Sequence, residues 1–299
     1  MRSRSLPIPL LIGLVIALVG GVRYCGQTQR NPVTGELQRV ALSPKQEVAL
    51  GLHSAPMMIA RHGGELRDSQ IAPYVESVGQ RLVQKSLANK SPYRFQFHVL
   101  ADKRTINAFA LPGGQIFITQ ALLVKLRSEA QLAGVLGHEI GHVIARHGAQ
   151  HLAKQQLGQL LVTAVQVGSY DSRDPHRNRN AALLAQAANQ MISLRYGRQD
   201  ELEADDYGFR IALDGGYDPH GIVELMQVLD EASAGGRVPE FLSTHPNPGN
   251  RRALLLERIQ QTFPSPPGLP SHLRSGQPEF AAHVLAPALD PWPPQKRTQ

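Results

Sequence analysis

The nine residues Val135-Leu136-Gly137-His138-Glu139-Ile140-Gly141-His142-Val143 decide how the rest of the chain is interpreted. They place His-Glu-x-x-His in an apolar run without proline, which predicts a helix. Residues four apart share a helix face, so His138 and His142 can bind one metal ion. Glu139 lies beside them and can hold a water on that metal without binding the metal itself. The stretch predicts a zinc site with Glu139 as the catalytic base, although paired histidines also occur on helices as ordinary polar groups.

The third zinc ligand must come from far along the chain. The next glutamate after Glu139 is Glu201, which excludes zinc proteases whose third ligand is a glutamate that follows closely. Glu201 opens an acidic stretch with helical character, in which Glu201 and Asp205 share a face. We expect Glu201 to bind the metal and Asp205 to orient a ligand histidine. The alternative, an acidic face turned to solvent, suits Glu203 and Asp206 better.

Four blocks of the sequence together resemble one family of zinc endopeptidases, which combines HExxH with a later ExxxD. The family includes the CAAX prenyl proteases, the HtpX-type membrane proteases and the periplasmic BepA-like proteases. The likeness is strongest to the BepA-like branch, because the several membrane spans of the other branches are missing. The matching blocks are Asn31-Pro32-Val33-Thr34-Gly35 with residues 42–51, residues 107–119, HExxH at 138–142 with ExxxD at 201–205, and Ser243-Thr244-His245-Pro246 with Arg251.

The resemblance implies an α+β, mainly helical, zincin-like domain. Its small β-sheet has an edge strand that flanks the active-site helix, and one Zn²⁺ is bound per chain. Residues 107–111 and 115–119 predict two short strands, and a substrate peptide can add to such an edge as another strand. Asn107, Gly113 and Gly114 are therefore candidate substrate-binding or structural residues. A plain β-hairpin fits the local sequence equally well.

The resemblance also suggests roles for two residues near the end of this domain. In the family, the histidine of the His-Pro pair lies near the metal and can occupy its open position, which keeps the enzyme latent. Carried over to this sequence, His245 is a candidate switch or oxyanion stabiliser; alternatively it only shapes a turn or binds substrate. Arg251, one turn into the next helix, is a candidate partner of Asp205 or of a substrate carboxylate.

The first residues have the composition of an export segment. Residues 1–5 contain two arginines, residues 6–22 are uncharged and largely apolar, and Arg23 follows. Such a segment is either a cleaved signal peptide or an uncleaved membrane anchor with its basic end in the cytoplasm, and both readings stay open. Either way we expect the remainder in the cell envelope, on the periplasmic side. It is then anchored in the inner membrane or secreted after cleavage.

Composition agrees with one catalytic domain. The 299 residues are 42% hydrophobic, enough for a sizeable core, and the single cysteine, Cys25, excludes an internal disulfide or a cysteine zinc site. The net charge of +7 is spread, and its densest cluster at 173–179 lacks aromatic residues, so no nucleic-acid partner is expected. The expected domains are residues 1–24 as signal or anchor, 25–264 as zinc metallopeptidase, and 265–299 as an extended Pro-rich tail.

Hydrophobic periodicity predicts the other elements. An alternating pattern indicates a half-buried strand over residues 93–100. Residues 169–180 have the composition of a mobile loop or flap. Helices are expected over residues 43–63, 70–89, 128–147, 152–167, 181–194, 201–214, 219–232 and 251–262.

The ligand set predicts hydrolysis of peptide bonds. Zinc held by two histidines and Glu201 lowers the pKa of its water, and Glu139 accepts the proton and passes it to the leaving amine. The expected substrates are unfolded or misfolded polypeptides of the envelope, and the membrane is contacted through the N-terminal segment. Two other functions stay open. One is a latent zinc-binding chaperone or scaffold whose site His245 keeps closed, and the other is a non-proteolytic metal-dependent hydrolase.

Overall fold

The computed structural model describes residues 7–168, 196–233, 238–245, 250–264 and 269–289. The chain divides into two compact units. The helix-pair unit combines residues 1–43 with 146–196, and the α5 unit combines residues 44–145 with 197–299. The chain is mainly helical with small sheets, which confirms the predicted fold class. The predicted loop at 169–180 and helix at 181–194 lie outside the described residues, and the predicted domain boundaries stay predictions.

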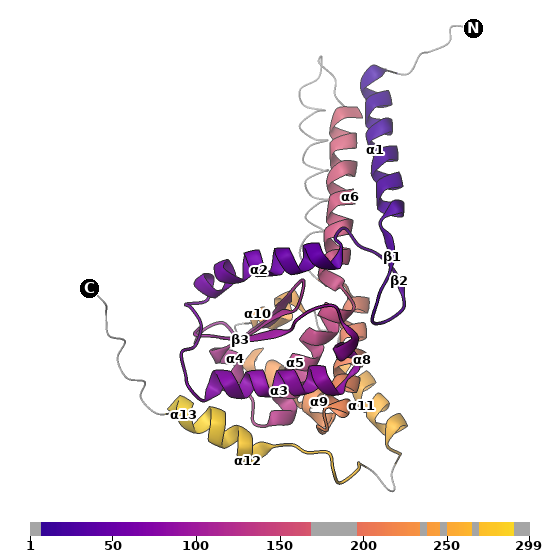
Figure 1. The fold of residues 1–299 in the computed structure, drawn as a ribbon. Helices are drawn as coiled ribbons and strands as arrows, with labels where there is room; N and C mark the ends of the chain where they lie inside the picture. The colour runs from indigo at the N-terminus through magenta and orange to yellow at the C-terminus, as the bar shows by residue number, and fades with distance from the viewer. Residues whose placement is uncertain (1–6, 169–195, 234–237, 246–249, 265–268, 290–299) are drawn as a thin grey trace, which may run out of the picture. The chain divides into compact units, whose positions relative to one another are not determined.

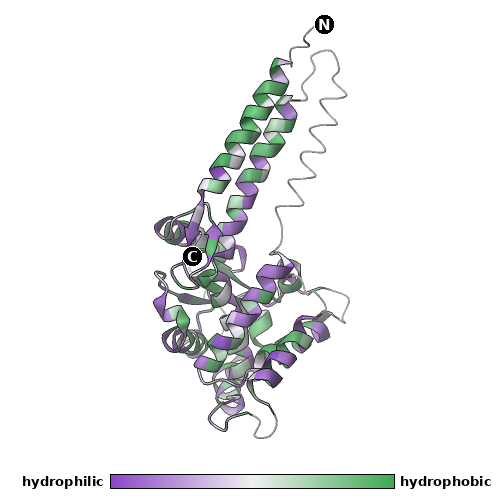
Figure 2. Cartoon of the chain, turned by 90° about the vertical axis from the view of Figure 1, so that its right-hand side faces the viewer, coloured by the Kyte–Doolittle hydropathy of each residue, from purple (hydrophilic) through white to green (hydrophobic). Residues whose placement is uncertain are grey.

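The helix-pair unit is dominated by two long helices that lie side by side in both views (Figures 1 and 2). They are α1 (Ile8–Gly26) and α6 (His147–Gly168). Between them in sequence, β1 (Thr28–Arg30) and β2 (Leu37–Arg39) form a short antiparallel ribbon. Among the described helices, α1 is the one that is long and apolar enough to cross a membrane.

The predicted active-site helix is shorter than expected, and the following helix begins earlier. Helix α5 (Glu129–Ile144) ends before Arg146, whose φ of 58° is left-handed, and α6 begins at His147 rather than 152. The Arg146 guanidinium donates hydrogen bonds to the Leu42 carbonyl (2.7 Å) and to Gln29 Oε1 (3.2 Å). These contacts within the helix-pair unit explain how a non-glycine residue holds a conformation that interrupts the helix.

The α5 unit is built around α5, every residue of which is buried. The Ser128 hydroxyl accepts a hydrogen bond from the Gln131 N–H and so caps the helix. A three-stranded sheet has the order β3 (Gln96–Leu100), β5 (Gln115–Thr119), β4 (Ala108–Leu111). Strand β5 pairs parallel with β3 and antiparallel with β4, which leaves β4 at an edge beside α5. This confirms the predicted small sheet whose edge strand flanks the active-site helix.

Glycines let α8 (Arg198–Asp214) approach α5 closely. A Cβ at Gly141 would lie 2.9 Å from the backbone oxygen of Ala204. A Cβ at Gly208 of α8 would lie 3.0 Å from the backbone nitrogen of His138. Since any side chain there would force the helices apart, these glycines bring the ExxxD turn of α8 against the HExxH turn of α5.

In the α5 unit, α2, α3, α9 and α11 agree with the predicted positions, with shifted ends, whereas the short helices α4 and α10 were not predicted. The helix predicted over 70–89 stops at Lys85, because the Ser86 hydroxyl accepts a hydrogen bond from the Ala88 N–H and starts a separate turn. The bounds are α2 (Pro44–Arg61), α3 (Ile71–Lys85), the 3-10 turn η1 (Leu87–Lys90), α4 (Gln120–Leu123), α9 (His220–Ser233), α10 (Glu240–Thr244) and α11 (Arg251–Thr262).

The prediction of an extended tail is wrong for residues 277–289. They form α12 (Gln277–Phe280), the π-helical turn η2 (Ala281–Leu285) and α13 (Ala286–Leu289). Phe280 and Val284, one turn apart, are fully buried, which explains why this Pro-containing segment is helical. The segment before it is tied to the start of α5, since the Arg274 guanidinium donates to Glu129 Oε1 at 2.7 Å.

Candidate metal centre

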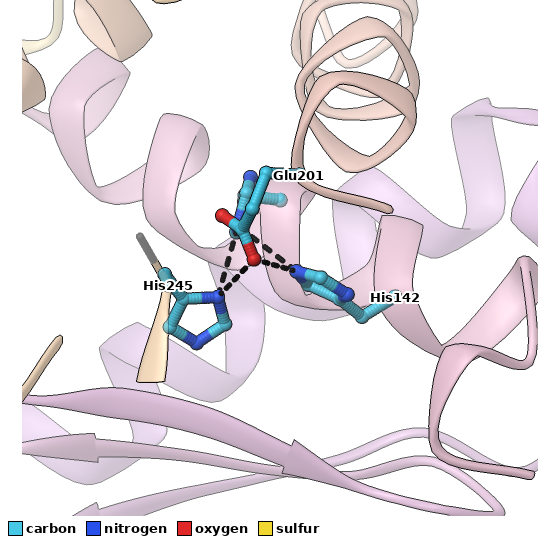
Figure 3. A group of neighbouring side chains, drawn as sticks. His142, Glu201 and His245 are labelled. Atoms are coloured by element: carbon cyan, nitrogen blue, oxygen red, sulfur yellow. Dashed lines mark hydrogen bonds and ion pairs between the residues drawn. The ribbon is translucent and has the colours of Figure 1, made fainter. Parts of the chain in front are cut away.

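Four side chains from three segments of the α5 unit meet at one point. Helix α5 supplies His138 and His142, α8 supplies Glu201, and His245 follows α10. One nitrogen or oxygen atom of each residue lies within 4.8 Å of the others, and all four residues are buried. Figure 3 shows the rings of His142 and His245 turned toward the Glu201 carboxylate. The structure therefore brings together the three predicted ligands and adds His245 to them.

The distances between these atoms fit a single zinc ion. His138 Nε2 lies 3.1 Å from His142 Nε2 and 3.5 Å from Glu201 Oε2. Glu201 Oε1 lies 3.5 Å from His142 Nε2 and 3.1 Å from His245 Nδ1. Ligands about 2.0–2.1 Å from a tetrahedral zinc are separated from each other by about 3.3–3.4 Å. Two nitrogens and a carboxylate at these separations form a suitable ligand set, with His245 at the fourth position.

Asp205 connects His138 to Arg251 behind the cluster. Asp205 Oδ1 lies 3.0 Å from His138 Nδ1, and the Arg251 guanidinium donates to both Asp205 oxygens at 2.6 Å. With Nδ1 donating to Asp205, His138 presents the lone pair of Nε2 to the cluster. Arg251 Nη1 also lies 2.9 Å from Glu201 Oε2. One guanidinium thus neutralises part of the charge of two buried carboxylates, which is the arrangement expected for the predicted Asp205–Arg251 pair.

The electrostatics of the cluster favour cation binding. Burial alone lowers the pKa of His138, but hydrogen bonds with Asp205 and Glu201 outweigh it and raise this pKa to about 9. Burial raises the pKa of Glu201, but the charge of His245 and hydrogen bonds with His138 and His142 outweigh it and hold this pKa well below its usual value. Without a cation the site therefore retains a proton, which a metal ion would have to displace.

Glu139 is buried next to the cluster but does not belong to it. Its carboxylate lies 3.6 Å from His245 Nε2, and neither oxygen accepts a hydrogen bond from any residue that the structure describes. Burial raises the pKa of the Glu139 carboxyl above its usual value. A fully buried carboxylate is costly unless something else satisfies it, and a water at the metal is the appropriate donor. This position suits the predicted role of Glu139 as the base.

His245 is held in place by contacts that the sequence alone did not indicate. Its ring stacks on Phe241, with centroids 4.5 Å apart and planes 24° from parallel. Phe241 is fully buried, and its N–H donates to the Ile106 carbonyl at 3.1 Å. Asn107, next along the chain, is buried and donates from Nδ2 to Glu240 Oε1 at 3.4 Å. The only sequence signal for Phe241 is its position one turn before His245.

The candidates Gly113 and Gly114 lie in the turn between β4 and β5. Their φ angles are 85° and 102°, which disfavour residues with a side chain. A Cβ at Gly113 would lie 2.5 Å from the Cα of Val48 on α2. These glycines therefore serve the turn and its packing, which favours the structural alternative for them over substrate binding.

Comparison with known proteins agrees with this geometry. The chain matches the model of "Peptidase family M48" over residues 69–259, more than half of its length. The chain belongs to peptidase family M48. Peptidases of family M48 use zinc, and the M48 region of this chain contains the whole His138, His142, Glu201 and His245 cluster, which can hold one ion. The resemblance inferred from the four sequence blocks is thereby confirmed.

Its curated M48 relatives include bacterial and mitochondrial proteases. The chain is 33% identical over 272 residues to the beta-barrel assembly-enhancing protease of Escherichia coli (strain K12), covering 88% of this chain and 53% of that protein. It is 27% identical over 258 residues to the mitochondrial metalloendopeptidase OMA1 of Schizosaccharomyces pombe, covering 85% and 72%. The human OMA1 metalloendopeptidase is 28% identical over 269 residues, covering 85% and 50%. The chain spans about half the length of the bacterial relatives it matches.

Proposed function

We propose that this M48 chain is a zinc-dependent metalloendopeptidase. The observation that carries the proposal is the buried cluster of His138, His142 and Glu201 beside the Glu139 carboxylate, which has no hydrogen-bond donor among the described residues. A structural zinc site gains nothing from a buried carboxylate beside the ligands, whereas hydrolysis requires a base at that place. Family membership and the names of the relatives support the same activity.

In the proposed mechanism, the chain's own residues hold the metal and move one proton. His138, His142 and Glu201 would hold zinc, and Asp205 with Arg251 keeps His138 in the tautomer that binding requires. When bound, zinc polarises the scissile carbonyl and makes a water acidic enough to attack near neutral pH. The Glu139 carboxylate accepts the proton of that water and transfers it to the leaving amine. The raised pKa of Glu139 helps it hold this proton between the two transfers.

The proposed substrate is an extended, unfolded polypeptide. Among the residues that the structure describes, β4 pairs with β5 on one side and with no strand on the other. A peptide that adds to this free edge would be recognised mainly through its backbone, so an unfolded segment of almost any sequence could be accepted. β4 packs beside α5, which carries Glu139, so a peptide bound there would lie next to the base.

We further propose that His245 keeps the resting site closed. Its Nδ1 lies 3.4 Å from His138 Nε2 and 3.1 Å from Glu201 Oε1, so it competes with water for the fourth position. This position also favours the second candidate function, a latent zinc-binding chaperone or scaffold of the envelope in which proteolysis is secondary. The short α10 that leads to His245 would have to shift before a water could take its place.

The proposed setting is the cell envelope, with a role in protein quality control. Helix α1 supports export, as a membrane anchor or as a signal that is later removed. The similarity to bacterial proteases named for assisting β-barrel assembly supports the periplasmic side of the inner membrane. Misfolded exported or membrane-associated proteins are the expected substrates.

The first test compares the wild type with Glu139→Gln for zinc content and casein cleavage. We expect one zinc per chain in both and about 10²–10⁴-fold slower cleavage by the variant, because only the base is lost. Glu257→Gln, an exposed glutamate on α11, is the matched control and should cleave like the wild type. Absence of zinc from both would overturn the proposal, as would equal and measurable cleavage by both, whereas zinc in both without cleavage by either leads to the second test.

The second test separates a latched protease from a chaperone. His245→Ala should keep its zinc through the other three ligands and cleave casein faster than the wild type. His53→Ala, an exposed histidine on α2, should change neither property. If His245→Ala retains zinc but gains no activity, and the wild type is also inactive, the chaperone or scaffold function is favoured.

A further inference from the structure

Helix α1 is coloured hydrophobic over most of its length in Figure 2, whereas α6 is mixed. In the outer half of α6, the exposed residues are Leu161 and Val165 together with Gln159 and Gln166. On α1, large apolar side chains such as Val15 and Leu18 are 58% and 68% exposed. On α6, Leu161 and Val165 are 42% and 52% exposed. The buried residues of α1 are instead Gly13 and Gly20. On α1, apolar side chains thus point outward and small residues inward, which is the reverse of a helix packed against a protein in water, and α6 adds exposed apolar side chains beside its exposed glutamines.

The two helices run antiparallel and touch through these glycines. A Cβ at Gly13 would lie 2.6 Å from the backbone oxygen of Ala164, and one at Gly20 would lie 3.2 Å from the Cβ of Leu160. Gly168, at the end of α6, faces Gly13 in turn. Close backbone approach at small residues is the usual way in which helices pair within a membrane, where burial of apolar side chains gives no advantage.

On both helices, the charged residues end at the same height along the helix pair. Gly20 lies opposite Leu157, Arg23 follows Gly20 by three residues, and Lys154 precedes Leu157 by three. Beyond that level, residues 8–22 of α1 and 155–168 of α6 contain no Asp, Glu, Lys, Arg or His. Two antiparallel helices with one common boundary between charged and uncharged residues match the boundary between headgroups and hydrocarbon.

The polar groups that remain on α6 explain why this helix does not resemble a membrane span by composition. Among the described helices, only α1 is apolar enough to qualify by itself. The hydroxyl of Thr163 donates to the Gln159 carbonyl within α6 at 2.9 Å, so it needs no water. With 19 residues, α1 is about 28 Å long, close to the roughly 30 Å of a bilayer core. Beside such a helix, α6 could enter lipid as a partner of α1, without being a span of its own.

We propose that the outer half of α6, residues 157–168, lies beside α1 in the hydrocarbon layer of a lipid bilayer. The chain then contacts the membrane through two segments: the N-terminal helix and a helix inserted between the HExxH and ExxxD motifs. The bilayer, rather than another protein, is the occupant that explains the shared charge boundary and the exposed apolar side chains on both helices. This inference does not depend on the proposed proteolysis.

The test measures how deeply single positions lie in lipid. Because Cys25 is the only cysteine, the full chain with Cys25→Ser can be labelled with the environment-sensitive dye NBD at one new cysteine at a time. The probed positions are Leu161→Cys and Val165→Cys on α6, Val15→Cys on α1 and Met57→Cys on α2, all exposed. Each labelled protein is reconstituted into phosphatidylcholine–phosphatidylglycerol vesicles, with or without bromine on the acyl chains. Mass spectrometry verifies that α1 is retained.

We expect brominated chains to quench NBD at residues 161 and 165 as strongly as at residue 15, and not at residue 57. Aqueous iodide should give the opposite ranking. Iodide quenching at 161 and 165 would overturn the proposal, because these positions would then face water. Protection from both quenchers would overturn it, because these positions would then be covered by protein. If the covering protein is a second copy of the chain, the protection would decrease as the protein is diluted in lipid. Absence of bromine quenching at residue 15 would overturn it as well.

Discussion

The α5 unit and the helix-pair unit depart from the usual distribution of side chains in opposite ways. In the α5 unit, a few charged residues are fully buried, with Arg251 and Glu201 both at 0% exposure. In the helix-pair unit, large apolar residues are exposed, with Val15 at 58%. Charged residues are almost never fully buried unless paired, and contiguous exposed apolar patches are uncommon on soluble proteins.

The comparison shows that each departure is informative only together with what surrounds it. The buried charges of the α5 unit are joined through hydrogen bonds and short contacts, from His138 through Asp205 to Arg251. The exposed apolar residues of α1 and α6 lie on the same side of one boundary, which is marked by Arg23 on α1 and Lys154 on α6. The first pattern is that of a reaction site, and the second is that of a surface made for a solvent other than water.

The largest effect is expected from removing the cation that both buried carboxylates share. Arg251→Met leaves Asp205 and Glu201 without their guanidinium, and we expect a loss of about 3–5 kcal/mol in the free energy of unfolding. Arg258→Met is the matched control on the same helix, since Arg258 pairs with Asp206 at the surface and should cost about 0–1 kcal/mol. Urea unfolding in detergent measures both. Equal losses in the free energy of unfolding would mean that the buried ion pairs of Arg251 stabilise the fold no more than the surface pair of Arg258.

Zinc affinity should depend on Asp205, which hydrogen-bonds to the ligand His138. Asp205→Asn keeps the shape of the side chain but removes the charge that supports His138, and we expect zinc affinity to fall about 10–100-fold. Asp206→Asn changes the neighbouring, partly exposed carboxylate, which pairs with Arg210 and Arg258, and should leave affinity unchanged. Competition with a chelator gives both values. Equal zinc affinities of Asp205→Asn and the wild type would show that the charge of Asp205 does not support metal binding by His138.

Much of the site could be predicted because its metal-binding residues lie at fixed spacings in the HExxH and ExxxD motifs. His138 and His142 need only a helix to share a face, and the sequence offers Glu201 as the next glutamate after Glu139. The close approach of α8 to α5 could not be predicted, because it depends on which glycines face each other across two helices far apart in sequence. Phe241 under His245 was missed for the same reason, since stacking is a property of the folded chain.

Other errors came from contacts between distant segments. The tail was expected to be extended because it is rich in proline, yet Phe280 and Val284 find a buried surface and make it helical. Glu129 accepts hydrogen bonds from Tyr74, Tyr217 and Arg274, and nothing local in the sequence links these residues. The start of α6 was placed too late because side-chain hydrogen bonds hold Arg146 in a left-handed conformation.

In the helix-pair unit, packing can be tested with two glycines of the same helix. Gly13→Ala places a methyl group 2.6 Å from the backbone of α6, and overpacking should exceed the gain in helix propensity by about 1 kcal/mol. Gly21→Ala meets no described atom within 4 Å and should stabilise the protein slightly. Thermal unfolding in detergent micelles distinguishes the two. Stabilisation by both variants would contradict the close contact of α1 with α6.

The smallest effect concerns the hydrogen bond between Asp102 and His62 in the α5 unit, whose side chains are 15% and 5% exposed. Asp102 Oδ2 lies 2.9 Å from His62 Nδ1. Burial raises the pKa of Asp102, but the hydrogen bond with His62 and those from Thr105 and Arg104 outweigh it, so this pKa lies below its usual value.

Because the pKa of Asp102 is lower in the folded chain than the roughly 3.9 of an unfolded aspartate, its ionised form stabilises the fold above that pH. The contribution is lost as the pH falls from about 4 toward the pKa in the folded chain. We therefore expect the wild type to be more stable than Asp102→Asn at pH 7, with the difference shrinking below about pH 4. Urea unfolding of both proteins across this range measures it, and comparing the two cancels any loss of metal that they share. A stability difference independent of pH would mean that Asp102 stabilises the fold through the geometry of its hydrogen bonds and not through its charge. Asp102 would then differ from the buried charged residues around Arg251.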